Sequence, residues 1–420
     1  MPLCRSEGGT FHYAGCGCSG YMPLPVPALV DDGVASARDA HHDRRSLRVL
    51  YLLPHQNLTG GMKMLVQQMG ILTARGHQVI AAFRGATPYG RALPPWTSLQ
   101  VAAEVLVSPT ETFEQFLSRL RGSYDVCMVG YFTQLAELDN FWGPAIYWEQ
   151  GHEHLFGEGR DPTLIHWDNL FHYSMLRSPV ALAAVSDYTA KTLALQFGRR
   201  CAVIPNAVDC TEYYPPPEAA PAASPSRDIK ARGHRVLLVG NPAQAFKGWD
   251  IALQALNLVH SELPELYVTW ICQAQPQLSG VCFPLEFIVN PAQDELPKIY
   301  RGGHDVLLFM SRFEAWGMPV MEAMASGIAV VCSYSYGVQH FATDQENCLM
   351  VPSRDVPATA VAVLRLLRDN DMREALASRG RQTALSYSLQ GVGDSLERAL
   401  MSTAAFFEKC PHPPQLPRYR

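Results

Sequence analysis

The chain has 420 residues, of which 48% are apolar. A chain of this length is longer than one hydrophobic core usually serves, so two domains are expected. The formal net charge of -5 at pH 7 argues against a nucleic-acid-binding surface, because such a surface needs clustered Lys and Arg. No uninterrupted apolar stretch of the sequence approaches the roughly 18–20 residues that span a bilayer.

The cysteines indicate a reduced protein. Most of them lie singly in apolar segments, as Cys127, Cys272 and Cys332 do, which is typical of buried thiols in cytoplasmic proteins. Cys16 and Cys18 form a close pair, but no second pair with zinc-like spacing follows it. We therefore expect a cytoplasmic location and interpret the close pair as part of an unstructured tail.

Residues 1–46 show neither a helical nor a strand period, and we predict that they form a disordered extension. They contain no basic region followed by an apolar core of about 7–15 residues, so a secretory signal is not expected. Four aspartates in this segment disfavour a transit peptide, although the sequence leaves organelle targeting open.

A β/α rhythm begins at residue 47. Residues 47–53 form a short apolar run that is typical of a buried parallel strand, and a Gly-rich loop at 57–61 leads into a helix over 62–75. Ser186 is well placed to cap a helix that ends at Phe197. These patterns predict a doubly wound domain over 47–212, with further strands at 78–83, 101–107, 126–130, 145–149, 181–185 and 201–204 and a helix at 112–121.

Residues 213–233 break this rhythm and predict a linker, because a run of three prolines is followed by Ala, Pro and Ser. The rhythm restarts in a second doubly wound domain over 234–385. We expect a C-terminal helix within 386–408 to pack back towards the first domain, and a tail at 409–420. The second domain has predicted strands at 235–239, 266–272, 283–289, 306–310 and 328–333 and predicted helices at 249–260, 318–324, 358–367 and 371–386. Ligands of such sheets bind at the carboxyl ends of the strands, so the site should lie in the cleft between the domains.

Residues 311–327, SRFEAWGMPVMEAMASG, are the most informative segment. The loop that carries Glu314 turns at Gly317 into a helix with Pro319 near its start, and the unpaired N–H groups there suit a pyrophosphate. Glu314 and Glu322 lie on either side of this helix start, where carboxylates suit the hydroxyl groups of sugars. The alternative is an ordinary helix start with two solvated glutamates.

This segment resembles, position by position, the E-x7-E signature of the retaining family-4 glycosyltransferases, or glycosyl transferases group 1. The resemblance implies the GT-B fold, an α/β architecture in which two Rossmann-like domains face each other across a cleft. It implies that Glu314 binds hydroxyls of the donor sugar and that Glu322 binds the ribose of the nucleotide. The backbone expected to line the diphosphate is that of Gly317, Met318, Pro319 and Val320.

Residues 240–248, GNPAQAFKG, follow the first predicted strand of the second domain. In the family an Arg follows the first Gly and a Lys precedes the last, and both contact the diphosphate. Lys247 matches this pattern, with a surface turn as the alternative. Asn241 replaces the Arg, and an amide cannot supply the charge or the fork of a guanidinium, which bears on catalytic power or donor choice.

Two segments of the first domain complete the predicted site. The family has a Gly-Gly loop beside the donor diphosphate and the acceptor, which Gly60 and Gly61 match, with a tight strand–helix turn as the alternative. The family also commonly has a His at the end of the strand over 145–149, and His152 is our first candidate for it. Loop structure and a metal site are the alternatives for the His-rich stretch there.

The sequence thus predicts a glycosyltransferase that moves a hexosyl group from a nucleotide-diphosphate sugar to an acceptor with retained configuration. Glu314, Lys247 and His152 are the candidate catalytic residues, and the resemblance implies neither a metal nor a cofactor. The sequence does not identify the acceptor, for which a saccharide, a lipid and a small molecule are the alternatives. It also does not indicate peripheral membrane contact. The alternatives are a non-catalytic nucleotide-sugar-binding protein, which Asn241 favours, and an epimerase-like enzyme of the same fold.

Overall fold

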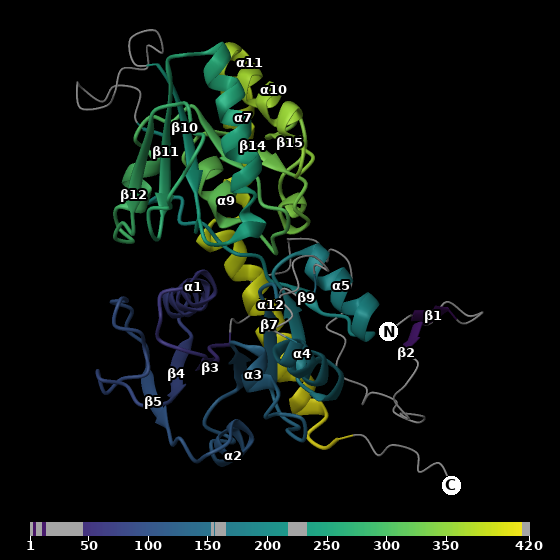
Figure 1. The fold of residues 1–420 in the computed structure, drawn as a ribbon. Coiled ribbons are helices and arrows are strands. Elements are labelled where there is room, and N and C mark those ends of the chain that lie inside the picture. Colours follow the sequence, from purple (N-terminus) through teal and green to yellow (C-terminus); the bar gives the residue numbers. More distant parts are fainter. Residues whose placement is uncertain are drawn as a thin grey trace, which may run out of the picture.

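The computed structural model describes residues 3–5, 11–13, 45–152, 155, 165–216 and 233–413. The sequence-based interpretations of the Cys16 and Cys18 pair, of most of the linker and of the last residues of the tail lie outside these ranges. Near the N-terminus, β1 (Leu3–Arg5) and β2 (Phe11–Tyr13) pair in antiparallel fashion (Figure 1), within the segment for which the sequence shows no strand period.

The N-terminal domain, in blue shades in Figure 1, is built on a parallel sheet of seven described strands in the order β5-β4-β3-β6-β7-β8-β9. Its central strands are apolar because helices cover both faces of the sheet, and all residues of β6, β7 and β8 are buried. The strands are β3 (Arg48–Leu53), β4 (Gln78–Arg84), β5 (Ala103–Val107), β6 (Val126–Val129), β7 (Ala145–Glu149), β8 (Ala181–Ala184) and β9 (Ala202–Val203). The helices are α1 (Gly60–Ala74), α2 (Phe113–Arg119), α3 (Phe132–Leu135), α4 (Ile165–Arg177) and α5 (Asp187–Phe197).

The C-terminal domain, in green shades, repeats this plan with a parallel sheet of six described strands in the order β12-β11-β10-β13-β14-β15. In both sheets the order of the strands reverses beside the first strand, between β3 and β6 and between β10 and β13, as in a doubly wound fold. The strands are β10 (His234–Val239), β11 (Leu266–Cys272), β12 (Leu285–Val289), β13 (Val306–Phe309), β14 (Ala329–Ser333) and β15 (Leu349–Val351). The helices are α7 (Trp249–Glu262), α8 (Leu296–Tyr300), α9 (Met318–Ala325), α10 (Val356–Arg368), α11 (Asn370–Ser386) and α12 (Leu389–Lys409), with short 3-10 helices η3 (Ala245–Lys247) and η4 (Gly337–His340).

The start of α1 differs from the prediction. Gly60 and Gly61 were expected in a loop, but they are the first two residues of the helix. Thr59 explains the early start, because its hydroxyl oxygen accepts a hydrogen bond from the N–H of Met62 and so caps the helix. The sequence patterns also did not predict α3, α4 and α8, whereas Ser186 caps α5 as expected.

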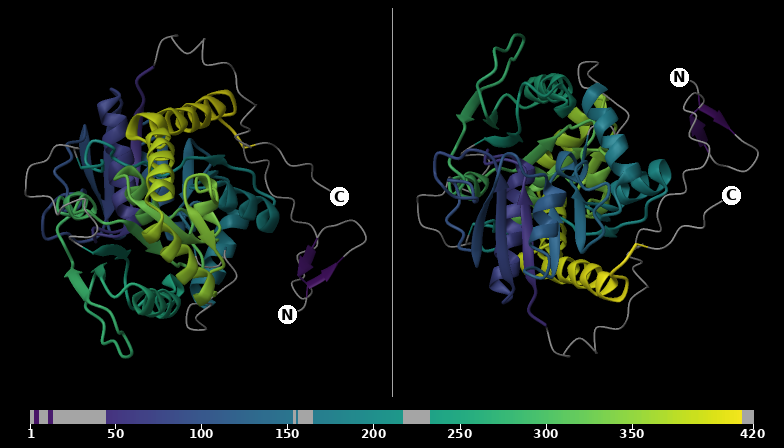
Figure 2. Two further views of the ribbon diagram at one scale, coloured as in Figure 1. Left: turned by 90° about the horizontal axis from the view of Figure 1, so that it is seen from above. Right: turned by 90° about the horizontal axis from the view of Figure 1, so that it is seen from below.

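The helix α12 (yellow in Figures 1 and 2) crosses from the C-terminal domain to the N-terminal domain and packs on α1, β6 and β7. Two described segments of the chain cross between the domains, and they lie side by side. Val208 and Ser388 form a parallel bridge there, and the N–H of Val208 donates to the carbonyl oxygen of Tyr387 at 2.9 Å.

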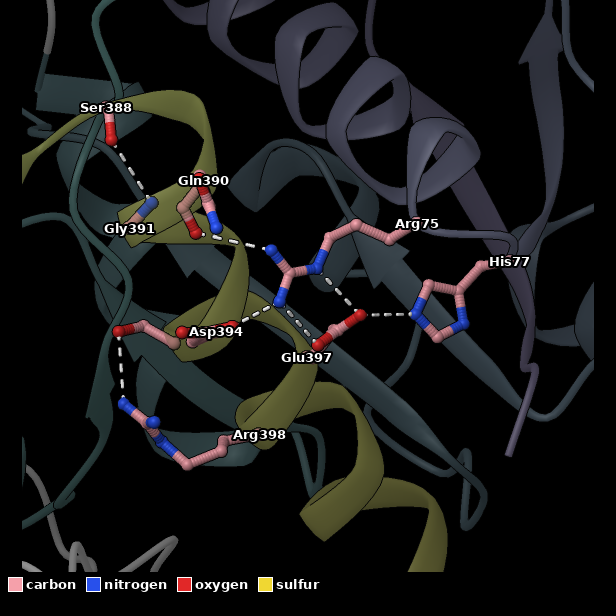
Figure 3. Close-up of polar contacts among 9 residues, drawn as sticks. Arg75, His77, Ser388, Gln390, Gly391, Asp394, Glu397 and Arg398 are labelled. Carbon is pink, nitrogen blue, oxygen red and sulfur yellow. Dashed lines mark hydrogen bonds and ion pairs between the residues drawn. The ribbon is translucent and has the colours of Figure 1, made fainter. Parts of the chain in front are cut away.

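A buried ionic cluster fixes α12 to the N-terminal domain (Figure 3). The guanidinium of Arg75 donates to both carboxylate oxygens of Glu397, at 2.8 and 2.9 Å, and also to Asp394. Nε2 of His77 lies 3.0 Å from the same carboxylate, while its Nδ1 accepts a hydrogen bond from the backbone. His77 therefore donates through Nε2. A side chain at Gly393 would overlap the guanidinium, so this glycine makes room for the cluster.

The cluster makes the stability of the fold depend on pH. Burial raises the pKa of the Glu397 carboxyl, but the hydrogen bonds from Arg75 and His77 outweigh burial, and the pKa lies below its ordinary value of 4.5. The carboxylate therefore stabilises the folded state fully above about pH 4.5, and this contribution is lost as the pH falls through the lowered pKa.

Two glycines fix the turns at the carboxyl ends of β10 and β13. Gly248 has a φ of 69°, and a β-carbon there would overlap the carbonyl oxygen of Met310. Gly317 has a φ of 97°, and its β-carbon would lie 2.6 Å from a methyl group of Val338. Both positions therefore require glycine for the backbone angle and for space.

We expect Glu397→Gln to lower the free energy of unfolding by about 3 kcal/mol at pH 7, because Arg75 loses its buried charged partner and keeps only the exposed Asp394. The variant should also lose less stability than the natural protein below about pH 4.5. Urea titrations across the acid range measure both effects. Glu408→Gln is the control, since Glu408 pairs with Arg45 at the exposed surface, and its substitution should leave the free energy of unfolding nearly unchanged. Identical acid dependence of Glu397→Gln and the natural protein would contradict this account.

We expect Gly248→Ala to lower the free energy of unfolding by about 3 kcal/mol or more, since strain and overlap with a backbone carbonyl add together. Gly198→Ala is the matched control. Gly198 has a similar φ of 66° but open space around its β-carbon, so strain alone should lower stability by about 1–2 kcal/mol. If urea titrations gave the two variants equal losses in the free energy of unfolding, the overlap with the Met310 carbonyl would contribute nothing, which would contradict this account.

Candidate active site

A cleft of about 940 Å³ lies between the two domains. Its walls are the segments that follow β3, β6 and β7 in the N-terminal domain and β10 and β13 in the C-terminal domain. These are the carboxyl ends of parallel strands at the two points where strand order reverses, which is where doubly wound sheets bind ligands.

An ion pair of Lys247 and Glu314 is the central feature of the C-terminal wall. Nζ of Lys247 lies 2.5 Å from Oε1 of Glu314, and the two side chains are only 15% and 14% exposed. The two residues are 67 positions apart in the sequence, but they follow β10 and β13, which are neighbours in the sheet. The topology of the sheet thus brings together the cation and the carboxylate that the sequence predicts for the site.

Further contacts join the two loops that carry this pair. The ring of Phe246 stacks on that of Phe313 with centroids 4.6 Å apart. The N–H of Arg312 donates to the carbonyl oxygen of Phe246 at 2.6 Å, and its guanidinium donates to the carbonyl oxygen of Ala245 at 3.0 Å. The loops therefore form one unit, and the positions of Lys247 and Glu314 depend on each other.

The start of α9 contributes the next part of this wall. Gly317, Met318 and Pro319 line the cleft, as expected for the backbone beside a diphosphate. Val320 does not line the cleft. Its side chain is fully buried, and its N–H donates to the carbonyl oxygen of Gly317 at 3.0 Å.

Glu322 also lies behind the cleft wall, and it is only 6% exposed. Its Oε2 accepts a hydrogen bond from the hydroxyl of Tyr300 at 2.9 Å, and its Oε1 lies 3.6 Å from Nζ of Lys63 on α1. Glu322 thus links the two domains in this structure, and its binding of a ribose stays a prediction.

Asn241 lines the cleft, but its side chain is turned onto its own loop. Its Oδ1 accepts a hydrogen bond from the N–H of Ala243 at 3.0 Å, the pattern of an Asx turn. Its carbonyl oxygen accepts a hydrogen bond from Nε1 of Trp249 at 2.9 Å. Asn241 therefore shapes the loop that leads to Lys247.

The start of α1 faces this wall from the N-terminal domain. Gly60 and Gly61 both line the cleft. A β-carbon at Gly61 would lie 3.3 Å from Oε1 of Gln150, so the missing side chain leaves room for Gln150 from the loop after β7. The residues predicted beside the donor thus lie on two facing walls.

His152 lines the cleft from the loop after β7. Its ring stacks on Phe171 with centroids 4.3 Å apart and an interplanar angle of 7°, and its Nδ1 lies 3.9 Å from Oδ1 of Asp168. Glu153 and His154, two other polar residues of this stretch, lie outside the described residues. Of the catalytic candidates, His152 is therefore the one supplied by the N-terminal domain.

Glu149 holds the loop of His152 in place. This carboxylate is 1% exposed, and it accepts hydrogen bonds from the N–H groups of Gly151 and His152 at 2.5 and 2.7 Å and from the hydroxyl of Tyr147 at 2.6 Å. Burial raises the pKa of Glu149, against the effect of these hydrogen bonds. The sequence did not predict this positioning role.

Tyr131, Trp167 and Asp168 also line the cleft, and the sequence analysis did not find them. Two of them lie on α4, which was not predicted. The sequence of α4 does contain a helical pattern, because the apolar residues Phe171 and Met175 are four positions apart. Both are buried in the structure.

Among the residues that the structure describes, no group of three or more His, Cys, Asp or Glu is arranged to hold a metal ion. None of the described helices combines the length and the apolar character that a membrane crossing requires.

Comparison with known sequences connects the C-terminal domain with a family. Residues 285–383 match the family model described as glycosyl transferases group 1. A D-inositol 3-phosphate glycosyltransferase of Corynebacterium urealyticum is 27% identical over 228 residues, which cover 50% of this chain and 53% of that protein. The chain thus spans about half the length of that relative. A D-inositol 3-phosphate glycosyltransferase of Xylanimonas cellulosilytica is 25% identical over 366 residues, which cover 77% of this chain and 87% of that protein.

Solved structures share the fold over most of the chain. Sucrose-phosphate synthase from Thermosynechococcus elongatus has a TM-score of 0.68 at 15% identity, and the match covers 86% of this chain and 100% of that one. HepE of Anabaena, solved in complex with UDP-glucose, has a TM-score of 0.64 at 16% identity, with 85% and 100% covered. The predicted GT-B fold of two facing Rossmann-like domains is therefore confirmed, and so is the predicted resemblance to the glycosyl transferases group 1, which the C-terminal domain carries.

Proposed function

We propose that this protein is a glycosyltransferase that moves a hexosyl group from a nucleotide-diphosphate sugar to an acceptor and retains the anomeric configuration. The observation that carries the proposal is the ion pair of Lys247 and Glu314 at 2.5 Å in the interdomain cleft. In this proposal Lys247 binds a phosphate of the donor and Glu314 its sugar hydroxyls, which is supported by their position together in the cleft beside the start of α9.

The donor is assigned to the C-terminal wall of the cleft. The family match at residues 285–383 supports this assignment because it includes the loop of Glu314 and all of α9. HepE, which shares the fold, was solved with UDP-glucose, and this makes UDP-glucose the first donor to test.

In the proposed reaction, the bond between the anomeric carbon and the diphosphate oxygen breaks, and a bond from an acceptor hydroxyl forms on the same face. The acceptor proton passes to the departing phosphate, so the nucleotide leaves as the diphosphate. Negative charge grows on that phosphate, and Lys247 with the backbone at the start of α9 stabilises it. Glu314 holds Lys247 in the cleft before the donor binds, which lowers the cost of reorganisation.

We expect Lys247→Met and Glu314→Gln each to lower kcat about 100-fold or more, because each removes a charged group that acts on the donor in the transition state. UDP release from UDP-glucose, with GDP- and dTDP-sugars tested in parallel, measures this effect. Lys298→Ala is the control, because Lys298 is 63% exposed on α8 and does not line the cleft. Full activity of Glu314→Gln would overturn the proposal.

The second candidate, a protein that binds nucleotide sugars without turning them over, rests on Asn241. Its amide oxygen is engaged by Ala243, and no guanidinium stands at this position. Under the proposed function the natural protein turns over its donor, and Asn241→Arg should raise kcat about tenfold by adding a charged hydrogen-bond donor to the diphosphate.

Calorimetry with UDP-glucose and a turnover assay distinguish these functions. Binding without turnover in the natural protein, and no turnover in Asn241→Arg, would support the binding protein instead. Conversion of the donor sugar to its epimer without an acceptor would support an epimerase-like enzyme.

A further inference from the structure

A cluster of aromatic rings forms part of the N-terminal wall of the cleft. Its base is Phe132, which is 1% exposed at the start of α3. Tyr131 lies against Phe132 with ring centroids 4.5 Å apart, and Trp167 meets it edge-on at 6.2 Å. The ring of His152 meets Phe132 edge-on at 4.9 Å, so the cluster also contains the catalytic candidate of this domain.

The two outer rings of the cluster face the cleft and remain accessible. Tyr131 and Trp167 are each 44% exposed and line the cleft, whereas the large rings of Trp148 and Trp270 are 1% exposed. The hydrophobic core of the domain does not require the rings of Tyr131 and Trp167, because the buried rings of Phe132 and Phe171 already cover the core at this point. Exposed aromatic surface in a concave site, supported by a rigid base, indicates a ligand.

A carboxylate lies beside these rings. Asp168 follows Trp167 on α4, and its side chain is 19% exposed and lines the cleft. A pyranose ring has an apolar face of C–H groups that packs on an aromatic ring, and its hydroxyls donate hydrogen bonds to carboxylates. The acyl chain of a lipid would form no hydrogen bond with the carboxylate of Asp168, and an anionic lipid headgroup would need a cationic side chain at this position.

We infer that Tyr131, Trp167 and Asp168 form a subsite for the acceptor and that the acceptor is a saccharide. Its sugar ring lies on the exposed indole of Trp167, and one of its hydroxyls donates to Asp168. This inference rests on the proposed function and adds the chemical class of the second substrate. His152 belongs to the same cluster, so the subsite adjoins the residues that face the donor.

A kinetic test offers the natural protein a panel of free glucose, mannose and galactose and their disaccharides, together with the donor that it cleaves fastest. We expect Trp167→Ala to raise the KM for the accepted saccharide about tenfold, while the KM for the donor stays the same. Trp167→Phe keeps an aromatic ring and should restore most of the affinity. Leu176→Ala, which changes a 47% exposed residue of the same helix outside the cleft, is the matched control and should behave as the natural protein.

Binding of the saccharides without a donor tests the subsite apart from turnover. We expect the accepted saccharide to change the tryptophan fluorescence of the natural protein and to have little effect in Trp167→Phe. An unchanged saccharide KM in Trp167→Ala would overturn the inference while leaving the proposed function in place, and so would transfer only to lipid in phosphatidylinositol vesicles. Absence of donor turnover would count against the proposed function, and the fluorescence titration would then decide on the subsite alone.

Discussion

The contact between Lys247 and Glu314 determines how the C-terminal half of the cleft is arranged. A cation and a carboxylate that are mostly buried stabilise each other only while both loops keep their positions. The stacked rings of Phe246 and Phe313 and the glycine turn at Gly248 serve this requirement, because they fix the two loops to each other and to the end of β13. The chain therefore maintains an ordered polar pair in an open cleft, where a nucleotide sugar is proposed to bind.

The two walls of the cleft differ in how far their residues could be predicted. The segment around Glu314 and Gly317 was predicted because its chemistry depends on residues close together in the sequence, namely a strand end, a glycine turn and a helix start. The aromatic cluster of the other wall was missed because its members come from the start of α3, the loop after β7 and α4, and only the tertiary fold brings them together.

The start of α1 was predicted wrongly because a cap outweighed the local pattern. Paired glycines suggested a loop, but the cap at Thr59 starts α1 before them. The sequence also did not reveal the contacts of Glu322, whose partners in the fold are Tyr300 and Lys63, and its binding of a ribose stays a prediction. No spacing in the sequence reveals the partners of a buried carboxylate, because they come from α8 in its own domain and from α1 in the other.

The docking of α12 has a mechanical consequence. Arg75 and His77 make this helix part of the N-terminal domain, although it continues directly from α11 of the C-terminal domain. The covalent connections between the two domains are thus the two adjacent crossings, where Val208 pairs with Tyr387 and Ser388. Two adjacent segments of chain permit rotation about one axis more easily than about others, so a rotation of one domain over the other would follow the line of these crossings. A rotation of this kind changes the width of the cleft while the structure of each wall is preserved.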